Sequence, residues 1–121
     1  MTENKLRRAD LAQFTGSECF YRHWLAHRIV FTEGVKYVAD MAAAYWLLDD
    51  IVFAQRLKRV LAEEFQLWRL RVDFADSTAR LVCEDGDGNR VFAKRIEYTD
   101  FPLEEIVFYF VNGTVLLPSE Y

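Results

Sequence analysis

The sequence contains few cysteines, prolines and glycines, and each shortage excludes a class of protein. Among 121 residues there are two Cys, two Pro and five Gly. Two cysteines provide no disulfide framework, and the chain has no Ser-, Gln- or Pro-rich run that would form a linker or a long disordered tail. No segment offers the roughly 18 consecutive apolar residues that a membrane span needs, and the start lacks the apolar stretch of a signal peptide. We therefore expect a cytoplasmic protein without a membrane partner, whose cysteines remain thiols.

Positive charge is also scarce. The formal net charge is −4, whereas a protein that binds the phosphate backbone needs a basic footprint, so we expect no nucleic-acid partner. A group of basic residues gathers in mid-chain, and from Glu97 to the end the only charged side chains are acidic. The basic group consists of Arg56, Lys58, Arg59, Arg69 and Arg71, and the acidic group consists of Glu97, Asp100, Glu104, Glu105 and Glu120. Such asymmetry can orient a protein partner, although ordinary solvated faces produce it too.

Apolar and aromatic residues are abundant. Hydrophobic residues make up 52% of the chain, with 10 Phe, 6 Tyr and 3 Trp. A chain of this length forms one hydrophobic core, and large rings bury substantial area each. We therefore predict a single domain, residues 1–121, with an aromatic core and some rings left for the surface.

The first half reads mainly as helix. "NKLRRADLAQF" predicts a short helix. Residues 18–31 are ambiguous, because their aromatic and β-branched residues favour strand whereas the lack of Gly or Pro permits helix, and a small hairpin is the preferred interpretation. In "TEGVKYVADMAAAYWLLDDIVFAQ", apolar residues recur at i, i+3, i+4 and i+7, with Thr32 as a cap, which predicts a long amphipathic helix. Neither Gly nor Pro interrupts the pattern up to about residue 63. A rod of that length, roughly 45 Å, does not fit a globule of this size, so a bend is expected between Phe53 and Glu64.

The second half changes to strand periodicity. "FQLWRLRVDF" alternates apolar and charged residues. "EIVFYFV" is apolar at nearly every position, which is typical of a central strand, and Asn112-Gly113 is a preferred two-residue turn. Helices first and strands second predict an α+β fold: N-terminal helices, one of them long and amphipathic, packed on one face of a four- or five-stranded antiparallel sheet formed by the C-terminal half.

The motif nearest to a known metal loop is "CEDGDGNRVF", residues 83–92. Asp85, Asp87 and Asn89 match the first three ligands of an EF-hand loop. The sixth position is Arg90 instead of glycine and the twelfth is Ile96, which has no oxygen ligand. Because alternating runs flank the motif, we interpret it as the turn of a β-hairpin.

The cysteines and histidines allow two further chemical readings. Cys19, His23 and His27 are spaced four apart, and Cys83 would complete a Cys₂His₂ set for zinc, but the spacing matches no finger. A Cys-His nucleophile is also conceivable, yet nothing marks an oxyanion hole or a third orienting residue. Isolated packing or surface roles are the preferred interpretation, so no metal and no cofactor is expected.

Asp49 is the most informative acidic residue. It projects near the middle of the apolar stripe of the long helix, where a carboxylate must be paired, capped or protonated. A bond to a backbone amide, a tyrosine or an arginine of the sheet is the structural reading, and an acid in a pocket between helix and sheet is the functional one. In "YTDFPLEE", Glu104 and Glu105 stand beside a turn proline and indicate a structured corner instead of an acid-base pair.

Several of these stretches carry a resemblance. "FTGSE", "GVKYVADMAAAYWLLDDI", "FQLW", "YTDFPLEEI" and "LLPSEY" resemble a family of small uncharacterised proteins found on bacterial chromosomes, plasmids and other mobile elements. The resemblance spans Phe14 to Tyr121, with "AQRLKRVLAEE" as a variable join. It implies an accessory protein of mobile DNA and no assigned activity, so it transfers no functional residue.

Two functions remain open. The first is a protein-binding or inhibitory module that acts through an aromatic-rich, charge-asymmetric surface, and the absence of a catalytic motif favours it over an enzyme. The second is a small-molecule-binding protein or small enzyme with a pocket around Asp49. The candidate binding residues are Asp49, Arg56, Arg59, Arg69 and Arg71, with no catalytic or metal-binding residue among them, and the oligomeric state is left open.

Overall fold

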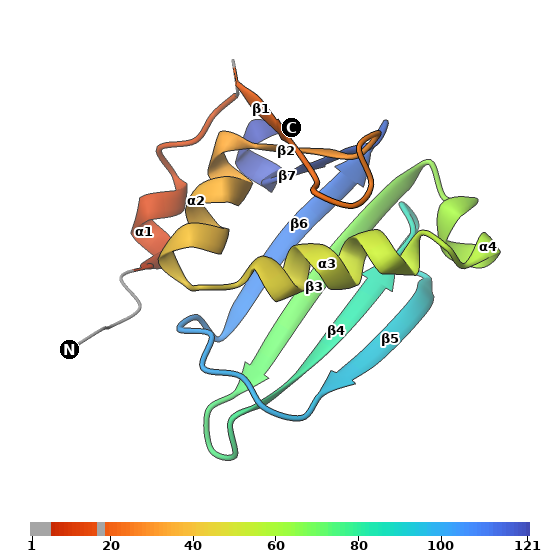
Figure 1. The fold of residues 1–121 in the computed structure, drawn as a ribbon. Helices are drawn as coiled ribbons and strands as arrows, with labels where there is room; N and C mark the ends of the chain where they lie inside the picture. Colours follow the sequence, from red (N-terminus) through yellow and green to blue (C-terminus); the bar gives the residue numbers. More distant parts are fainter. Residues whose placement is uncertain (1–5, 17–18) are drawn as a thin grey trace.

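The computed structural model describes residues 6–16 and 19–121 and shows an α+β fold (Figure 1). Its α-helices are α1 (Arg8–Leu11), α2 (Glu33–Met41), α3 (Tyr45–Ala54) and α4 (Lys58–Leu61), and a 3-10 turn, η1, covers Pro118–Glu120. Its strands are β1 (Phe20–Arg22), β2 (Val30–Thr32), β3 (Phe65–Asp73), β4 (Thr78–Glu84), β5 (Arg90–Ile96), β6 (Glu105–Val111) and β7 (Thr114–Leu116). The short N-terminal helix and the hairpin expected within residues 18–31 are confirmed by α1 and by the β1–β2 pair.

The seven described strands form one mixed sheet in the order β1-β2-β7-β6-β3-β4-β5. The predicted four- or five-stranded antiparallel sheet of the C-terminal half is therefore wrong in size and in type. Five strands of the second half do pair antiparallel, but β2 joins them through a parallel pairing with β7, in which Phe31 lies opposite Val115. The prediction missed this because β2 has only three residues, too few for a periodic pattern, and because its partner lies more than 80 residues away in the chain.

The strand assignments within the second half are confirmed. β6 lies between β7 and β3, as expected of an apolar central strand, and Asn112-Gly113 forms the turn between β6 and β7 with positive φ at both residues. The segment around Asp85 is the turn of the β4–β5 hairpin. In β3, Trp68, Leu70 and Val72 are buried as the alternation predicts, whereas Phe74 lies beyond the strand and is exposed.

The predicted long helix is broken in two. α2 ends at Met41, and Ala43 adopts a left-handed conformation with φ of 51° before α3 begins. The N–H of Ala44 donates to the carbonyl of Ala39 at 2.9 Å, which is the 6→1 bond of a Schellman motif. Such a motif usually has glycine at the left-handed position, so an alanine there gave no stop signal in the sequence. The bend expected between Phe53 and Glu64 is present as well, because α3 ends at Ala54 and the short α4 follows.

We predict that Ala43→Gly stabilises the protein by about 0.5–1 kcal/mol. A left-handed residue with a Cβ costs roughly 1–2 kcal/mol, part of which is offset by the greater freedom of glycine in the unfolded chain. Ala43 is exposed, so no packing is lost. Urea unfolding measures the change, and Ala62→Gly is the control, since Ala62 is also exposed but has an ordinary φ of −67°. An equal or opposite effect at the two positions would contradict the assignment.

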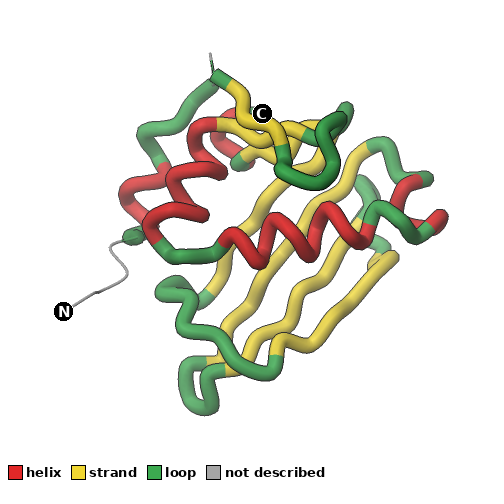
Figure 2. Tube along the Cα trace, in the orientation of Figure 1, coloured by secondary structure: helices red, strands yellow, loops and turns green. Residues whose placement is uncertain are grey.

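The helices lie on one face of the sheet, and the other face is not covered by a described helix (Figure 2). The buried face of the sheet includes Trp68 and Leu70 from β3 and Phe108 from β6, which pack against Leu47 and Ile51 of α3. Alternate residues of the same strands therefore point to the opposite, open face. The sequence predicted this two-faced sheet, and the structure confirms it.

Two buried glutamines connect the helix layer to the sheet. Gln55, at the end of α3, and Gln66, on β3, exchange side-chain amide hydrogen bonds of 2.8 and 3.0 Å. Gln66 Nε2 also donates to the carbonyl of Val60 at 2.9 Å, and its Oε1 accepts from the indole N–H of Trp68 at 2.9 Å. This network fixes the connection between α3, α4 and β3, because each buried polar group in it has a partner.

Candidate functional site

The loop between β1 and β2, residues 23–29, is held in place by a buried histidine. The N–H groups of Leu25 and Ala26 donate to His23 Nδ1 at 3.1 and 3.2 Å. Nδ1 is therefore an acceptor, and the ring hydrogen lies on Nε2. The loop is closed further by the N–H of His23, which donates to the carbonyl of Ile29 at 2.9 Å. His23 is thus the internal anchor of this loop.

Asp49 fastens the same loop to α3. Its Oδ1 accepts a hydrogen bond of 2.9 Å from His23 Nε2, and its side chain is 31% exposed. The carboxylate is paired, as the structural reading required, but with a histidine of the loop instead of a backbone amide, a tyrosine or an arginine of the sheet. The hollow between α3 and the sheet has an entirely apolar lining that does not include Asp49. A binding role for Asp49 stays a prediction.

Around this anchor, large apolar side chains face the solvent. Trp24 is 43% exposed, Leu25 is 66% exposed, and Tyr21 and Phe53 are exposed too. Trp24 stacks on His23 at 4.1 Å and meets Tyr45 edge-on at 5.5 Å, both distances being between ring centroids. We call Tyr21, Trp24, Leu25 and Phe53 the aromatic patch. A small hollow of about 210 Å³ lies within it, lined in part by Leu25, Phe53 and Arg56.

The structure separates the predicted arginines. Arg56 follows α3 and lies over the ring of Phe53, with its guanidinium carbon 5.3 Å from the ring centroid. Arg59 belongs to α4, and its Nε donates to the carbonyl of Val91 on β5 at 3.0 Å. Arg56 and Asp49 therefore border the aromatic patch, through Phe53 and through the His23–Trp24 stack. Arg59 instead connects α4 to the sheet.

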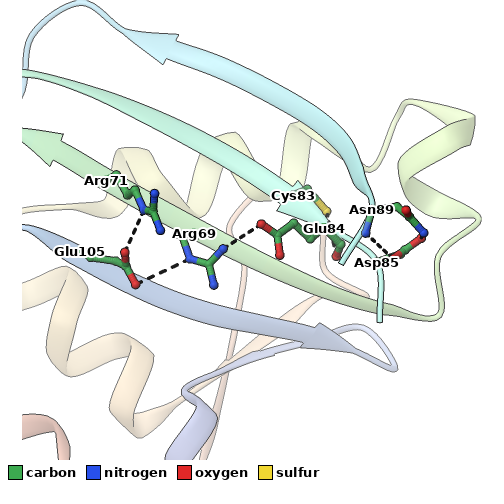
Figure 3. Close-up of polar contacts among 7 residues, drawn as sticks. All are labelled: Arg69, Arg71, Cys83, Glu84, Asp85, Asn89 and Glu105. Carbon is green, nitrogen blue, oxygen red and sulfur yellow. Dashed lines mark hydrogen bonds and ion pairs between the residues drawn. The ribbon is translucent and has the colours of Figure 1, made fainter. Parts of the chain in front are cut away.

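Arg69 and Arg71 lie on the open face of the sheet (Figure 3). Arg71 Nε donates to Glu105 at 2.9 Å, and Arg69 Nη1 donates to Glu84 at 2.7 Å. Glu105 therefore forms an ion pair with an arginine of the neighbouring strand. The five candidate residues thus lie in separate places instead of forming one site.

The four possible zinc ligands do not form a cluster. No group of three or more His, Cys, Asp or Glu residues suited to a metal ion occurs in the described part of the chain. Cys19 is exposed, Cys83 is buried against the sheet, and His23 uses both ring nitrogens within the loop. The side chains that could hold a metal are therefore engaged elsewhere or lie apart.

The Asp85 turn has its own internal bonds (Figure 3). The Asp85 carboxylate accepts hydrogen bonds from the N–H groups of Asn89 and Asp87, at 2.9 and 2.8 Å. These bonds, first the one from Asn89, hold the pKa of the Asp85 carboxyl below its ordinary value. The acidic residue that suggested a cation site thus shapes the hairpin turn.

We predict that only one thiol of the native protein reacts with a thiol reagent at pH 8. Burial, followed by the nearby carboxylates of Glu63, Glu84 and Asp85, raises the pKa of the Cys83 thiol to about 12. Cys83 therefore stays protonated and inert, while the exposed Cys19 reacts. Counting modified thiols with and without denaturant should give one and two equivalents. The variant Cys83→Ala should give one under both conditions, and two fast-reacting thiols in the native protein would contradict the burial.

The same thiol makes stability depend on alkaline pH. The pKa of this thiol in the folded protein lies above its ordinary value of 9.0. The free energy of unfolding that the thiol contributes is therefore fully present below about pH 9 and is lost as the pH rises from there toward 12.

Sequence reasoning missed most of the aromatic patch. Asp49 and Arg56 were singled out, but Trp24, Leu25 and the anchoring His23 were not assigned to a surface. The predicted hairpin could have indicated this surface. A seven-residue loop that contains Trp and Leu exposes apolar side chains unless another element covers it.

The fold and its surfaces define a class: a small α+β domain with a helix layer on one face of a mixed seven-stranded sheet. None of the helices in the described residues is long and apolar enough to cross a membrane. A family model matches residues 5–121, and the chain belongs to the family of unknown function DUF6876. Neither the curated proteins nor the solved structures contain a match. Membership confirms the resemblance to an uncharacterised family, while its bacterial and mobile-element context stays a prediction.

Proposed function

We propose that the protein is a small protein-binding or inhibitory accessory module whose contact surface is the aromatic patch. The observation that carries this proposal is that Trp24 and Leu25 face solvent on a loop whose conformation is already fixed by His23 and Asp49. Interfaces are enriched in Trp, Tyr, Phe and Arg, and a loop ordered in advance loses little conformational entropy on binding.

The charges around the patch define the partner. Arg56 lies over Phe53 within it, and Arg22, His27 and Arg28 are exposed on the loop or its flanking strand. The nearest described acid on α3, Asp49, is engaged by His23. The surface therefore suits a protein segment that combines apolar side chains with acidic ones, because opposite potentials speed association and exclude wrong partners.

The proposal includes the biological context that the sequence resemblance implies. The protein then acts in the cytoplasm of a bacterium, is carried on a chromosome, a plasmid or another mobile element, and binds a host or mobile-element protein. Cell fractionation tests the location, and recovery of the protein outside the cytoplasmic fraction would contradict it. The second function, an enzyme or ligand binder with a pocket around Asp49, is not favoured by a comparable observation.

A matched pair of leucines tests the binding surface. Leu25 and Leu61 are 66% and 63% exposed, but only Leu25 belongs to the aromatic patch. In capture experiments with purified wild type, Leu25→Asp and Leu61→Asp, we expect a stoichiometric protein partner to be retained by wild type and Leu61→Asp. Leu25→Asp should weaken its binding by about tenfold or more, equivalent to about 1.4 kcal/mol.

Two further variants separate contact from positioning. Arg56→Glu should weaken binding by reversing a charge at the surface, and higher salt should reduce the wild-type affinity. Asp49→Ala removes the acceptor of the His23 bond, so it should weaken binding while circular dichroism shows a folded protein. Equal retention by Leu25→Asp and wild type would refute the proposal. So would a dimer of this chain in solution that Leu25→Asp dissociates, because the patch would then be a self-association surface.

A further inference from the structure

Three arginines stand in one row across the open face of the sheet. Arg71 on β3 lies directly opposite Arg80 on β4, and Arg80 lies opposite Arg95 on β5. Like charges directly opposite each other destabilise a sheet. This row of arginines is therefore unfavourable for the stability of the sheet, and locally unfavourable arrangements of this kind are concentrated at binding sites.

Next to this row lies a hollow of about 520 Å³, the arginine hollow. Its lining consists of Arg69, Arg71, Arg80, Val82, Glu84 and Arg90. The register explains its shape: Val82 lies between Arg69 and Ala93 on neighbouring strands, so short side chains form the floor and long ones the walls. Figure 3 shows Arg69, Arg71 and Glu84 on this face of the sheet, away from the helices.

The charges in the hollow are unbalanced. Glu84 binds Arg69 at 2.7 Å, and Glu105 lies 2.9 Å from Arg71 and 3.6 Å from Arg69. These two carboxylates offset Arg69 and Arg71. Within the described residues, neither Arg80 nor Arg90 forms a salt bridge, although Arg90 lies opposite Glu84 in the pairing of β4 with β5. Four guanidinium groups therefore share two carboxylates, and two positive charges remain. This excess is local, because the chain as a whole carries a net charge of −4.

We propose that the arginine hollow binds a phosphorylated small molecule that carries at least two negative charges. Guanidinium groups bind phosphate oxygens in a bidentate manner, and two uncompensated arginines match a dianion. The volume lies within the range of about 300–1,000 Å³ that small-molecule sites occupy. A nucleic-acid strand fits less well, since it needs a basic track longer than one hollow. The site is independent of the aromatic patch and does not depend on the function proposed above.

Pyrophosphate titration tests this site. We expect calorimetry at low ionic strength to detect pyrophosphate binding to the wild-type protein, and a matched amount of sodium chloride to produce no comparable signal. Arg80→Gln and Arg90→Gln should each raise the dissociation constant by about tenfold or more. Arg7→Gln removes an exposed arginine outside the hollow and should leave the constant within about twofold. Adenosine diphosphate as a second probe distinguishes a nucleotide from a bare phosphate.

Each contrary result overturns the proposal. Absence of pyrophosphate binding up to about 1 mM would do so, and so would equal losses in Arg80→Gln, Arg90→Gln and Arg7→Gln. Citrate bound more tightly than pyrophosphate would make the ligand a polycarboxylate, and a single-stranded oligonucleotide bound more tightly would make the surface a nucleic-acid site. The ligand-free Arg80→Gln variant should melt no lower than wild type, because it removes a like-charge contact. If Arg80→Gln nevertheless melts at a lower temperature, pyrophosphate binding by Arg90→Gln decides the test.

Discussion

Trp68→Ala is expected to lower the free energy of unfolding by about 3–5 kcal/mol. The side chain is only 1% exposed and packs beneath α3, with its ring 5.5 Å from that of Phe92. Truncation leaves a cavity, and it also removes the indole N–H that donates to Gln66. The free energy of unfolding of a typical domain is about 5–15 kcal/mol, so the yield of folded protein should fall clearly in this variant.

Urea unfolding of Trp68→Ala and Trp24→Ala measures this effect with an internal control. Trp24 is 43% exposed, so the same truncation there should cost clearly less. Trp46 is half-buried and should fall between the two. Equal losses of unfolding free energy in the two variants would mean that Trp68 is not the buried residue and Trp24 not the exposed one.

Gln66→Leu is expected to cost about 2–4 kcal/mol, although leucine has a similar size and is more apolar. Gln66 is fully buried, and its amide serves Gln55, Val60 and Trp68 at once. Leucine would leave the indole N–H of Trp68 and the amide oxygen of Gln55 without a partner, whereas the carbonyl of Val60 still accepts from the N–H of Glu63. Each buried polar group left unsatisfied costs about 1–3 kcal/mol. The cost reflects the groups that remain more than the bonds that are lost.

A double-mutant cycle with Gln55→Leu distinguishes this network from simple packing. If the two amides act as a pair, the double variant should be more stable than the sum of the single losses predicts, because neither amide is then left facing an apolar partner. Denaturant unfolding of the four proteins provides the comparison. Additive losses would show that the glutamines contribute independently.

The sequence allowed the local elements of this fold to be predicted better than their assembly. Strands β3 and β6 and the turn at Asn112-Gly113 follow from alternation and turn chemistry, which act over a few residues. The break at Ala43 did not follow, because tertiary packing holds an alanine where glycine is expected. The pairing of Phe31 with Val115 depends on residues far apart in the chain, and a three-residue strand carries no pattern that reveals it.

The candidate sites show the same limit. Asp49 was recognised as a carboxylate that needed a partner, but the partner, His23, comes from a loop that only the folded chain brings to α3. Arg69 and Arg71 were recognised as a charged strand face. Arg80 and Arg90, which complete the hollow, belong to neighbouring strands, so the grouping depends on strand register. Composition indicated positive charge in mid-chain, and the sheet determined where it gathers.

The position of β7 between β2 and β6 has a consequence for how the chain folds during synthesis. Within the described sheet, the β1–β2 hairpin joins the other strands only through β7, residues Thr114–Leu116. The carboxylate of Glu120 accepts hydrogen bonds from Thr32 at 2.6 Å and from the N–H of Gly34 at 3.2 Å, at the start of α2. On a ribosome, residues 20–34 are therefore made early but cannot dock until the segment after residue 113 has emerged. The aromatic patch lacks this support until residues 114–120 have emerged, an interval in which exposed apolar side chains favour aggregation or chaperone binding.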